Sequence, residues 1–323
     1  MTVSDKTTAP PKKLDGCVLT IGNFDGVHLG HRYILEQTLA KARLLGAEPV
    51  VMTFEPHPYK FFNPHEVHYL LLPFEEKYDL IRKAGIETIV VTEFTRDFAK
   101  MSPHEYARRI LKELIGPSTI VVGNNFTFGR MASGDVSLLK SFAKEYGYNV
   151  VIAEPYVIGG KVVSSSRIRQ HIRYGQVREA AGFLGYFPYI RGAVVTGTHR
   201  GTNILGIPTA NIETGWELLP QNGVYAVRVS LEDGDLRGQY NGVADIGLNP
   251  TFGGHELKIE VHILDFTSDI VGRRIRVEFI EKIRDEIRFF TADELGQKIR
   301  EDINIARNIL SDRAGVPGKG MKV

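Results

Sequence analysis

The first half of the chain alternates short apolar segments with longer amphipathic ones. The apolar segments are rich in Val and Ile and predict buried strands of a parallel sheet, at 17–22, 49–54, 88–94, 119–123 and 149–155. The segments between them place apolar side chains on one helical face, and Ser102, Pro103 and Glu105 form the pattern of a capped helix start. Repeated strand–helix units indicate a doubly wound α/β domain that binds its ligand beyond the carboxyl ends of the strands.

The pattern changes near Tyr186, after a helical segment at 164–185. Short strands with alternating apolar and polar residues follow at 190–197, 223–231, 238–247, 258–266 and 273–283. This alternation predicts an antiparallel barrel or sandwich, and a helix with Thr291 as its N-cap comes after it. We therefore expect a flexible tail at 1–14, a first domain at 15–185, a second domain at 186–312 and a flexible tail at 313–323.

Length and composition fit two ordinary globular domains. The 323 residues carry a net charge of +2, and 43% of them are hydrophobic, which gives no indication of a nucleic-acid groove. No apolar run approaches the ~20 residues that cross a bilayer, and the first residues lack the apolar region of a targeting peptide. We expect a cytoplasmic protein that binds neither nucleic acid nor membrane, while its oligomeric state stays open. The single cysteine, Cys17, begins a predicted strand and is interpreted as core.

The sequence GNFDGVHLGH, residues 22–31, joins the first predicted strand to the first helix. A helix N-terminus offers unpaired N–H groups and a positive dipole end to phosphate, and Gly26 and Gly30 let the backbone approach a ligand. His28 and His31 are three residues apart, so both imidazoles lie near that terminus and can donate hydrogen bonds to a phosphate. The glycine spacing fits neither a dinucleotide loop nor a P-loop. We infer a nucleotide-phosphate site; in the alternative, the glycines turn the chain and the histidines cap the helix.

The longer form of this motif resembles the adenylyltransferase module of bacterial bifunctional riboflavin kinase/FAD synthetases, within the nucleotidylyltransferase superfamily. FEPHP at 54–58, VGNNFTFG at 122–129 and VVSSSRIR at 162–169 agree with that family in order. The resemblance implies that the phosphate of FMN attacks the α-phosphorus of ATP with Mg²⁺ and expels pyrophosphate. It implies that ATP binds at Asn23, Phe24, Asp25, His28, His31, Ser165, Ser166 and Arg169, and that the flavin lies at His57 and Asn125.

Two positions depart from that family's pattern. The family often has an acidic residue where Asn124 or Asn125 stands, and an arginine where Ala132 stands, although Arg130 is close by. Both departures concern the flavin side of the site and leave the type of reaction unchanged.

The segment HRGTNILGIPTANIE, residues 199–213, marks a second candidate site. Thr209 offers a hydroxyl and Asn211 an amide carbonyl, both hard oxygen ligands that suit Mg²⁺. Gly201 and Gly206 could admit a phosphate close to the backbone. On its spacing alone, however, the segment is more typical of an ordinary β-turn.

This segment resembles the G-x-P-T-A-N sequence of riboflavin kinases, which form a six-stranded barrel. The resemblance implies that Thr209 and Asn211 hold Mg²⁺ and the ATP phosphates, and that Asn249 and Thr251 lie near the flavin. It also implies that Glu260 takes the proton from the ribityl 5′-hydroxyl as that oxygen attacks the γ-phosphate. In this family a tyrosine is common where Val271 stands.

Glu260 also has a simpler interpretation. Lys258 and His262 share its strand face, so Glu260 could be an ordinary surface carboxylate in an ion pair. For the whole chain, the resemblance covers about residues 15–310 and implies phosphorylation of riboflavin to FMN and adenylation of FMN to FAD. Two alternatives stay open: only one activity is retained, or the chain is a non-enzymatic flavin-binding protein on the same folds.

Overall fold

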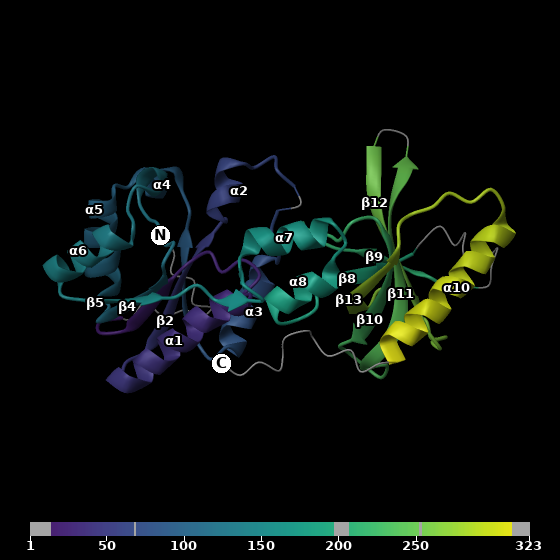
Figure 1. Ribbon diagram of the computed structural model, residues 1–323, viewed down its shortest axis with the longest axis horizontal. Helices are drawn as coiled ribbons and strands as arrows, with labels where there is room; N and C mark the ends of the chain where they lie inside the picture. The colour runs from purple at the N-terminus through teal and green to yellow at the C-terminus, as the bar shows by residue number, and fades with distance from the viewer. Residues whose placement is uncertain (1–13, 68, 197–206, 252–253, 312–323) are drawn as a thin grey trace. The chain divides into compact units, whose positions relative to one another are not determined.

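The computed structural model describes residues 14–67, 69–196, 207–251 and 254–311. For residues 248–251 and 254–257 it describes the backbone alone. The chain divides into two compact units, Met1–Ser165 and Ser166–Val323 (Figure 1). The predicted tails lie almost wholly outside the described residues, and the predicted domain boundary at 185 stays a prediction.

The first unit is built on a five-stranded sheet in the order β3-β2-β1-β4-β5, and all of its pairings are parallel. This confirms the predicted doubly wound sheet. Its strands are β1 (Val18–Ile21), β2 (Pro49–Glu55), β3 (Thr88–Glu93), β4 (Thr119–Gly123) and β5 (Asn149–Ala153). The strand order reverses at the central strand β1, and such sheets bind ligands at that point, beyond the strand carboxyl ends.

Helices cover both faces of this sheet. Leu35 of α1 and Ile81 of α3 pack on one face, and Ile110 of η1 and Leu139 of α6 pack on the other. The predicted capping box is present, because Ser102 and Glu105 bond to each other's backbone N–H groups at 3.2 and 2.9 Å. The elements are α1 (Leu29–Leu45), α2 (Pro58–Phe62), α3 (Phe74–Lys83), α4 (Arg96–Lys100), α5 (Pro103–Glu105), the π-helical η1 (Tyr106–Ile115), the 3₁₀ turn η2 (Arg130–Ala132), α6 (Val136–Tyr146), and the hairpin of β6 (Val157–Ile158) and β7 (Lys161–Val162).

The second unit contains a closed six-stranded barrel in the order β10-β11-β12-β9-β8-β13. The open choice between barrel and sandwich is thereby settled. The strands are β8 (Tyr189–Val195), β9 (Ala210–Glu213), β10 (Gly223–Leu231), β11 (Gly238–Thr251), β12 (Gly254–Ile263) and β13 (Arg274–Arg284). The sequence did not predict β9, which has four residues and lies in the segment interpreted as a turn.

The predicted helical segment at 164–185 is divided into α7 (Ser165–Arg173) and α8 (Val177–Leu184). Gly175 between them has φ +70°, in the left-handed region that favours glycine. A Cβ atom there would lie 2.8 Å from the Lys282 side chain and 2.9 Å from the Tyr225 hydroxyl. Any other residue at this position would be strained by the positive φ and would have to displace the Lys282 side chain.

The last helix, α10 (Ala292–Ser311), packs on the outside of the barrel and begins at the predicted N-cap, where Thr291 accepts a hydrogen bond from the N–H of Glu294. Its buried Ala306 and Leu310 share one apolar cluster with Ala226 and Ile280 of the barrel. Beside this cluster, Asp302 accepts hydrogen bonds from Arg284 on β13 at 2.8 and 2.9 Å. This ion pair joins α10 to the barrel, and Asp302 is only 2% exposed.

We predict that Asp302→Ala lowers the free energy of unfolding by about 3 kcal/mol, because the partly buried charge of Arg284 loses the carboxylate that bonds to it. Denaturant unfolding can be followed by the fluorescence of the chain's single tryptophan, Trp216, in the second unit. Glu301→Ala is the matched control, because Glu301 is the neighbour of Asp302 on α10 and pairs with Lys298 on the exposed side of the helix. Equal effects of the two substitutions would contradict the account of α10.

Cys17 is 2% exposed in the sheet core, and burial raises the pKa of its thiol to about 12, with a further rise from the charge of Glu48. Only the thiolate reacts with disulfide reagents, and an ordinary cysteine with a pKa of about 8.5 is partly ionised at pH 8. We predict that the native chain does not react with a chromogenic disulfide at pH 8, and that one thiol reacts after unfolding in guanidinium. Fast reaction of the native chain would show that Cys17 is not core.

Candidate functional site

The turn from β1 into α1 brings the two histidines of the motif together. His28 is the N-cap of α1, and its Nδ1 accepts a hydrogen bond from the backbone N–H of His31 at 3.2 Å. Because Nδ1 accepts, the proton of the neutral ring is assigned to Nε2, which is therefore a donor. The two rings stack with centroids 3.6 Å apart and planes 13° apart. His28 thus caps the helix, as the alternative interpretation held, and still carries a donor nitrogen at the helix N-terminus.

In the same turn, two residues other than glycine have a backbone φ in the left-handed region, Phe24 at +50° and Val27 at +36°. Such a backbone costs of the order of 1–3 kcal/mol for each residue and persists only where the surroundings fix it. Thr53 donates to the Asn23 carbonyl at 3.3 Å, and the N–H of Leu71 donates to the Asp25 carboxylate at 3.0 Å. These bonds fix the turn from two sides.

Three predicted ATP-binding residues have structural roles in this turn. Phe24 and Asp25 are 1% and 4% exposed, so both side chains point into the protein. Ser165 donates from its hydroxyl to the Asp25 carbonyl at 3.0 Å and ties the start of α7 to the turn. Ser166 is exposed and Arg169 is buried in the second unit, and their place beside the histidines stays a prediction.

An aromatic pocket of about 980 Å³ lies in the first unit. Asn23, which lies two residues after the end of β1, lines it, together with residues that follow β2 and β3. His57 and Asn125, the predicted flavin residues, are absent from its lining, although their neighbours Pro58 and Phe126 belong to it. The aromatic lining consists of Phe54, Phe61, Phe62, Phe94, Phe98, Tyr106, Phe126 and Phe128.

This pocket was not predicted from the sequence, although the sequence carries a signal for it. The segments FEPHPYKFF and EFTRDF place phenylalanines directly after two neighbouring parallel strands, whose carboxyl ends meet at one edge of the sheet. His57 instead caps α2, because its side chain accepts a hydrogen bond from the N–H of Tyr59 at 3.1 Å. Ala132, one of the two departures, lines the pocket beside Met131, and both have positive φ.

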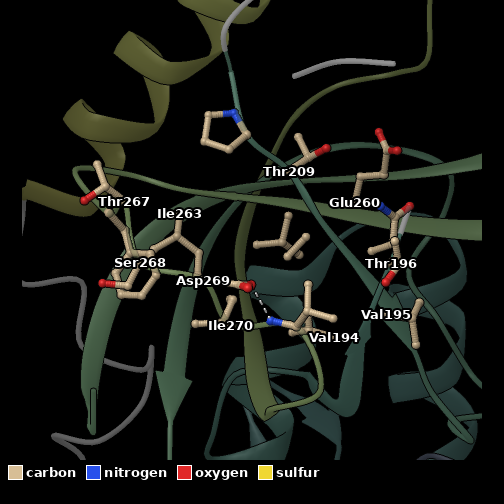
Figure 2. A pocket seen from close by; sticks show the side chains of 16 residues that line it. Val194, Val195, Thr196, Thr209, Glu260, Ile263, Thr267, Ser268, Asp269 and Ile270 are labelled. Carbon is tan, nitrogen blue, oxygen red and sulfur yellow. Dashed lines mark hydrogen bonds between the residues drawn. The ribbon is translucent and has the colours of Figure 1, made fainter. Parts of the chain in front are cut away.

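A second pocket, of about 290 Å³, lies in the second unit and gathers three predicted residues, Thr209, Asn211 and Glu260 (Figure 2). Glu260 on β12 pairs in register with Asn211 on β9. Its neighbours Ile259 and Val261 are buried in the barrel, so the alternation along the strand turns Glu260 outward. Figure 2 shows Thr209 and Glu260 at one end of the pocket, with Thr267 and Ser268 at the other.

Charged neighbours surround Glu260. It forms an ion pair with Lys258, as the simpler interpretation held, and it lines the pocket as well. His262, two residues along, bonds through Nδ1 with the Pro208 carbonyl at 2.8 Å and holds the segment that carries Thr209.

Asp245 lies directly opposite Glu260 on β11 and was not predicted from the sequence. Crowding of its carboxyl group by protein, followed by the negative charges of Glu286 and Glu260, raises the pKa of Asp245 to about 6. Of these three carboxylates, Glu260 lines the pocket, and its charge is paired with that of Lys258.

The remaining predicted kinase residues are less fully described. Gly201 and Gly206 lie outside the described residues. Asn249 and Thr251 lie on β11, where they pair in register with Glu256 and Gly254 of β12, and their side chains are likewise outside the description. Val271 lines the second pocket and is 53% exposed, so the position where a tyrosine was expected is on its rim.

Thr209 and Asn211 offer Mg²⁺ two oxygen ligands of the kind that it shares with phosphates and water. Among the described residues, no group of three or more His, Cys, Asp or Glu side chains could hold a metal ion. Mg²⁺ prefers six oxygen ligands and often takes only one or two from protein, with phosphates and water supplying the others. A hydroxyl and an amide oxygen in one pocket fit this pattern.

Comparison with known proteins agrees with both halves of the chain. Residues 10–167 match a family model described as FAD synthetase, and residues 184–310 match one described as riboflavin kinase. A Haemophilus influenzae protein named bifunctional riboflavin kinase/FMN adenylyltransferase is 34% identical over 294 residues, covering 91% of this chain and 94% of that protein. Proteins of the same name from Escherichia coli K12 and Pseudomonas fluorescens are 36% and 35% identical and cover 91% and 93% of this chain, with 92% and 94% of their own lengths matched.

A crystal structure described as a macrolide-efflux protein from Streptococcus pneumoniae has the same fold. It is 31% identical to this chain, with a TM-score of 0.84, and the match covers 95% of this chain and 98% of the other. Within the part of this chain that is described, no helix has the length and apolar character needed to cross a membrane.

Proposed function

The chain belongs to the family of bifunctional riboflavin kinase/FMN adenylyltransferases, and we propose which residues carry each of the two reactions. The enzyme phosphorylates riboflavin to FMN with ATP, and it transfers the adenylyl group of a second ATP to FMN, which gives FAD and pyrophosphate. Both halves match their family models, so the alternatives of a single retained activity or a flavin-binding protein without catalysis lose their support. Since both reactions consume ATP, we place the enzyme in the cytoplasm.

In the adenylyltransferase, we assign the ATP phosphates to the N-terminus of α1 with His28 and His31. An oxygen of the FMN phosphate attacks the α-phosphorus, and the bond to the departing pyrophosphate breaks. Nε2 of His28 donates to the oxygens on which negative charge grows, and His31 lies stacked against it. Asn23, Phe24 and Asp25 shape the turn against which ATP rests, and Ser165 bonds to that turn. For Ser166 and Arg169 we keep the ATP-phosphate role that the sequence resemblance implies. The stacked pair at a helix N-terminus is the observation that carries this assignment.

We assign the flavin ring of FMN to the aromatic pocket of the first unit. Its phenylalanines offer faces and edges on which a flat ring stacks, and its volume is that of an ordinary ligand site. Asn23 belongs both to this pocket and to the turn before His28, so the flavin phosphate is placed on the side of the histidines. His57 and Asn125 then support the edge of the pocket through their neighbours.

In the kinase, we assign the role of general base to Glu260. Its carboxylate takes the proton of the ribityl 5′-hydroxyl, that oxygen attacks the γ-phosphorus of ATP, and ADP leaves. Thr209 and Asn211 hold the phosphates and Mg²⁺, which neutralises phosphate charge when it is bound, and Gly201 and Gly206 belong to the same ATP site. Asn249 and Thr251 are assigned to the flavin. The register pair of Glu260 and Asn211 in one pocket supports this proposal.

We predict that His28→Ala lowers the rate of FAD formation from FMN by about 10²–10³-fold, the loss expected for one donor to the transition state. His28→Asn is the matched variant, because asparagine is a good N-cap but places no imidazole at the phosphate. Both variants should form FMN from riboflavin at the wild-type rate, measured by chromatography of the products. A His28→Asn enzyme with normal FAD formation would show that His28 is only a cap.

We predict the opposite pattern for Glu260→Gln. Loss of the general base should slow phosphorylation of riboflavin by about 10²–10⁴-fold, while FAD formation from supplied FMN is unchanged. Glu281→Gln serves as the control, because it removes another barrel carboxylate that pairs with Arg178 and does not line the pocket. Loss of both activities in a folded Glu260→Gln enzyme would contradict the assignment.

A further inference from the structure

A buried lysine lies behind the β1–α1 turn of the first unit, and neither reaction described above uses it. Lys77 belongs to α3 and is 5% exposed. Its Nζ donates to the Thr53 hydroxyl and to the Phe54 carbonyl, each at 3.3 Å, and lies 5.0 Å from the centre of the Phe74 ring. Removing an ammonium group from water is costly, and a methionine would fill the same space without that cost. The charge therefore has a role other than packing.

The surrounding charges favour the ammonium form of this side chain. Burial lowers the pKa of Lys77, and the carboxylates of Glu55 and Asp25 act against that change. Asp25 is itself buried in the turn, and Glu55 ends β2. The ammonium group of Lys77 thus lies between the end of β2 and the β1–α1 turn.

Thr53 connects this cation to the turn. Its hydroxyl accepts the hydrogen bond from Lys77 and donates its own proton to the Asn23 carbonyl at 3.3 Å. A hydroxyl has one proton to donate, so an ammonium group on its acceptor side leaves that proton directed at Asn23. The polarised hydroxyl is also the stronger donor. Asn23 opens the segment in which Phe24 and Val27 are held at positive φ.

We propose that Lys77 is a positioning residue of the adenylyltransferase: through Thr53 it fixes Asn23 and the strained turn that aims His28 and His31 at the transferred phosphate. The inference rests on the proposed role of the two histidines. Lys77 acts from behind the turn through the protein and makes no contact with substrate in this mechanism. Small displacements of catalytic groups lower the reaction rate strongly, since a displacement of about 1 Å can reduce it by about 10²-fold.

The test is Lys77→Met, which keeps the length of the side chain and removes its charge and its donors. We expect kcat for FAD formation from FMN to fall by about 10–100-fold, with KM for ATP and FMN within about twofold of wild type. The reason is that the substrates still bind, while His28 and His31 are displaced from the transferred phosphate. Riboflavin phosphorylation, measured on the same protein, should not change. Lys83→Met is the matched control, because Lys83 lies exposed on the same helix. A Lys77→Met enzyme with kcat within twofold of wild type would overturn the inference.

A second variant, Thr53→Val, removes the connecting hydroxyl and leaves the lysine in place. If Lys77 acts through Thr53, this variant reproduces the loss in kcat, and the double variant is no slower than Lys77→Met alone. Losses that multiply in the double variant would overturn the proposed route. If thermal unfolding shows that Lys77→Met does not fold, Thr53→Val decides alone, and a normal kcat in it overturns the inference.

The His28→Asn enzyme separates this inference from the function on which it rests. A large loss in His28→Asn together with normal kcat in Lys77→Met overturns only the role of the lysine. Normal kcat in His28→Asn overturns the role of the histidines, and the role of Lys77 with it.

Discussion

The turn from β1 into α1 depends on Phe24 and Val27 adopting a backbone that residues with side chains normally avoid. Both side chains are almost fully buried, in one apolar cluster with Leu35 of α1 and Ile81 of α3. Burial of side chains of this size stabilises by about 1.5–3 kcal/mol each, which is enough to offset a backbone cost of about 1–3 kcal/mol each. Core packing therefore determines where the chain enters α1, and His28 and His31 stack at that entry. The catalytic geometry of the first unit is a consequence of its core.

In the second unit, the regular alternation of β-strands places the candidate catalytic residues. Along an antiparallel strand, successive side chains point to opposite faces, so β12 buries Ile259 and Val261 in the barrel and turns Glu260 out. The short strand β9 then sets Asn211 beside Glu260. The fixed register of the closed barrel brings together residues that are about fifty positions apart in the sequence. The hydrogen bond between His262 and the Pro208 carbonyl holds the segment that carries Thr209 against β12.

Strong periodicity made most of the fold predictable. The five parallel strands and the barrel strands β8, β10, β11, β12 and β13 were located from apolar runs and alternation. The capping signals of Ser102 and Thr291 gave two helix starts. Two features were missed. The glycine at 175 is itself a local signal for a helix end, because it adopts a positive φ that other residues rarely adopt. The strand β9 is too short to show a pattern of its own.

For the candidate sites too, some residues were predicted from the sequence and others were missed. Thr209, Asn211 and Glu260 were identified by resemblance and share one pocket. The aromatic pocket was missed because its phenylalanines come from separate loops, and Lys77 was missed because a lysine in an amphipathic helix usually faces solvent.

Two separable sites, one for each reaction, are the central claim of this account. The most direct test mixes the His28→Asn and Glu260→Gln enzymes with riboflavin, ATP and Mg²⁺ and measures FAD by chromatography. Each variant alone should give no more than traces of FAD. The account predicts that the mixture forms FAD after FMN has accumulated, because each variant supplies the site that the other lacks. FMN that accumulates in the mixture without conversion to FAD would contradict the account.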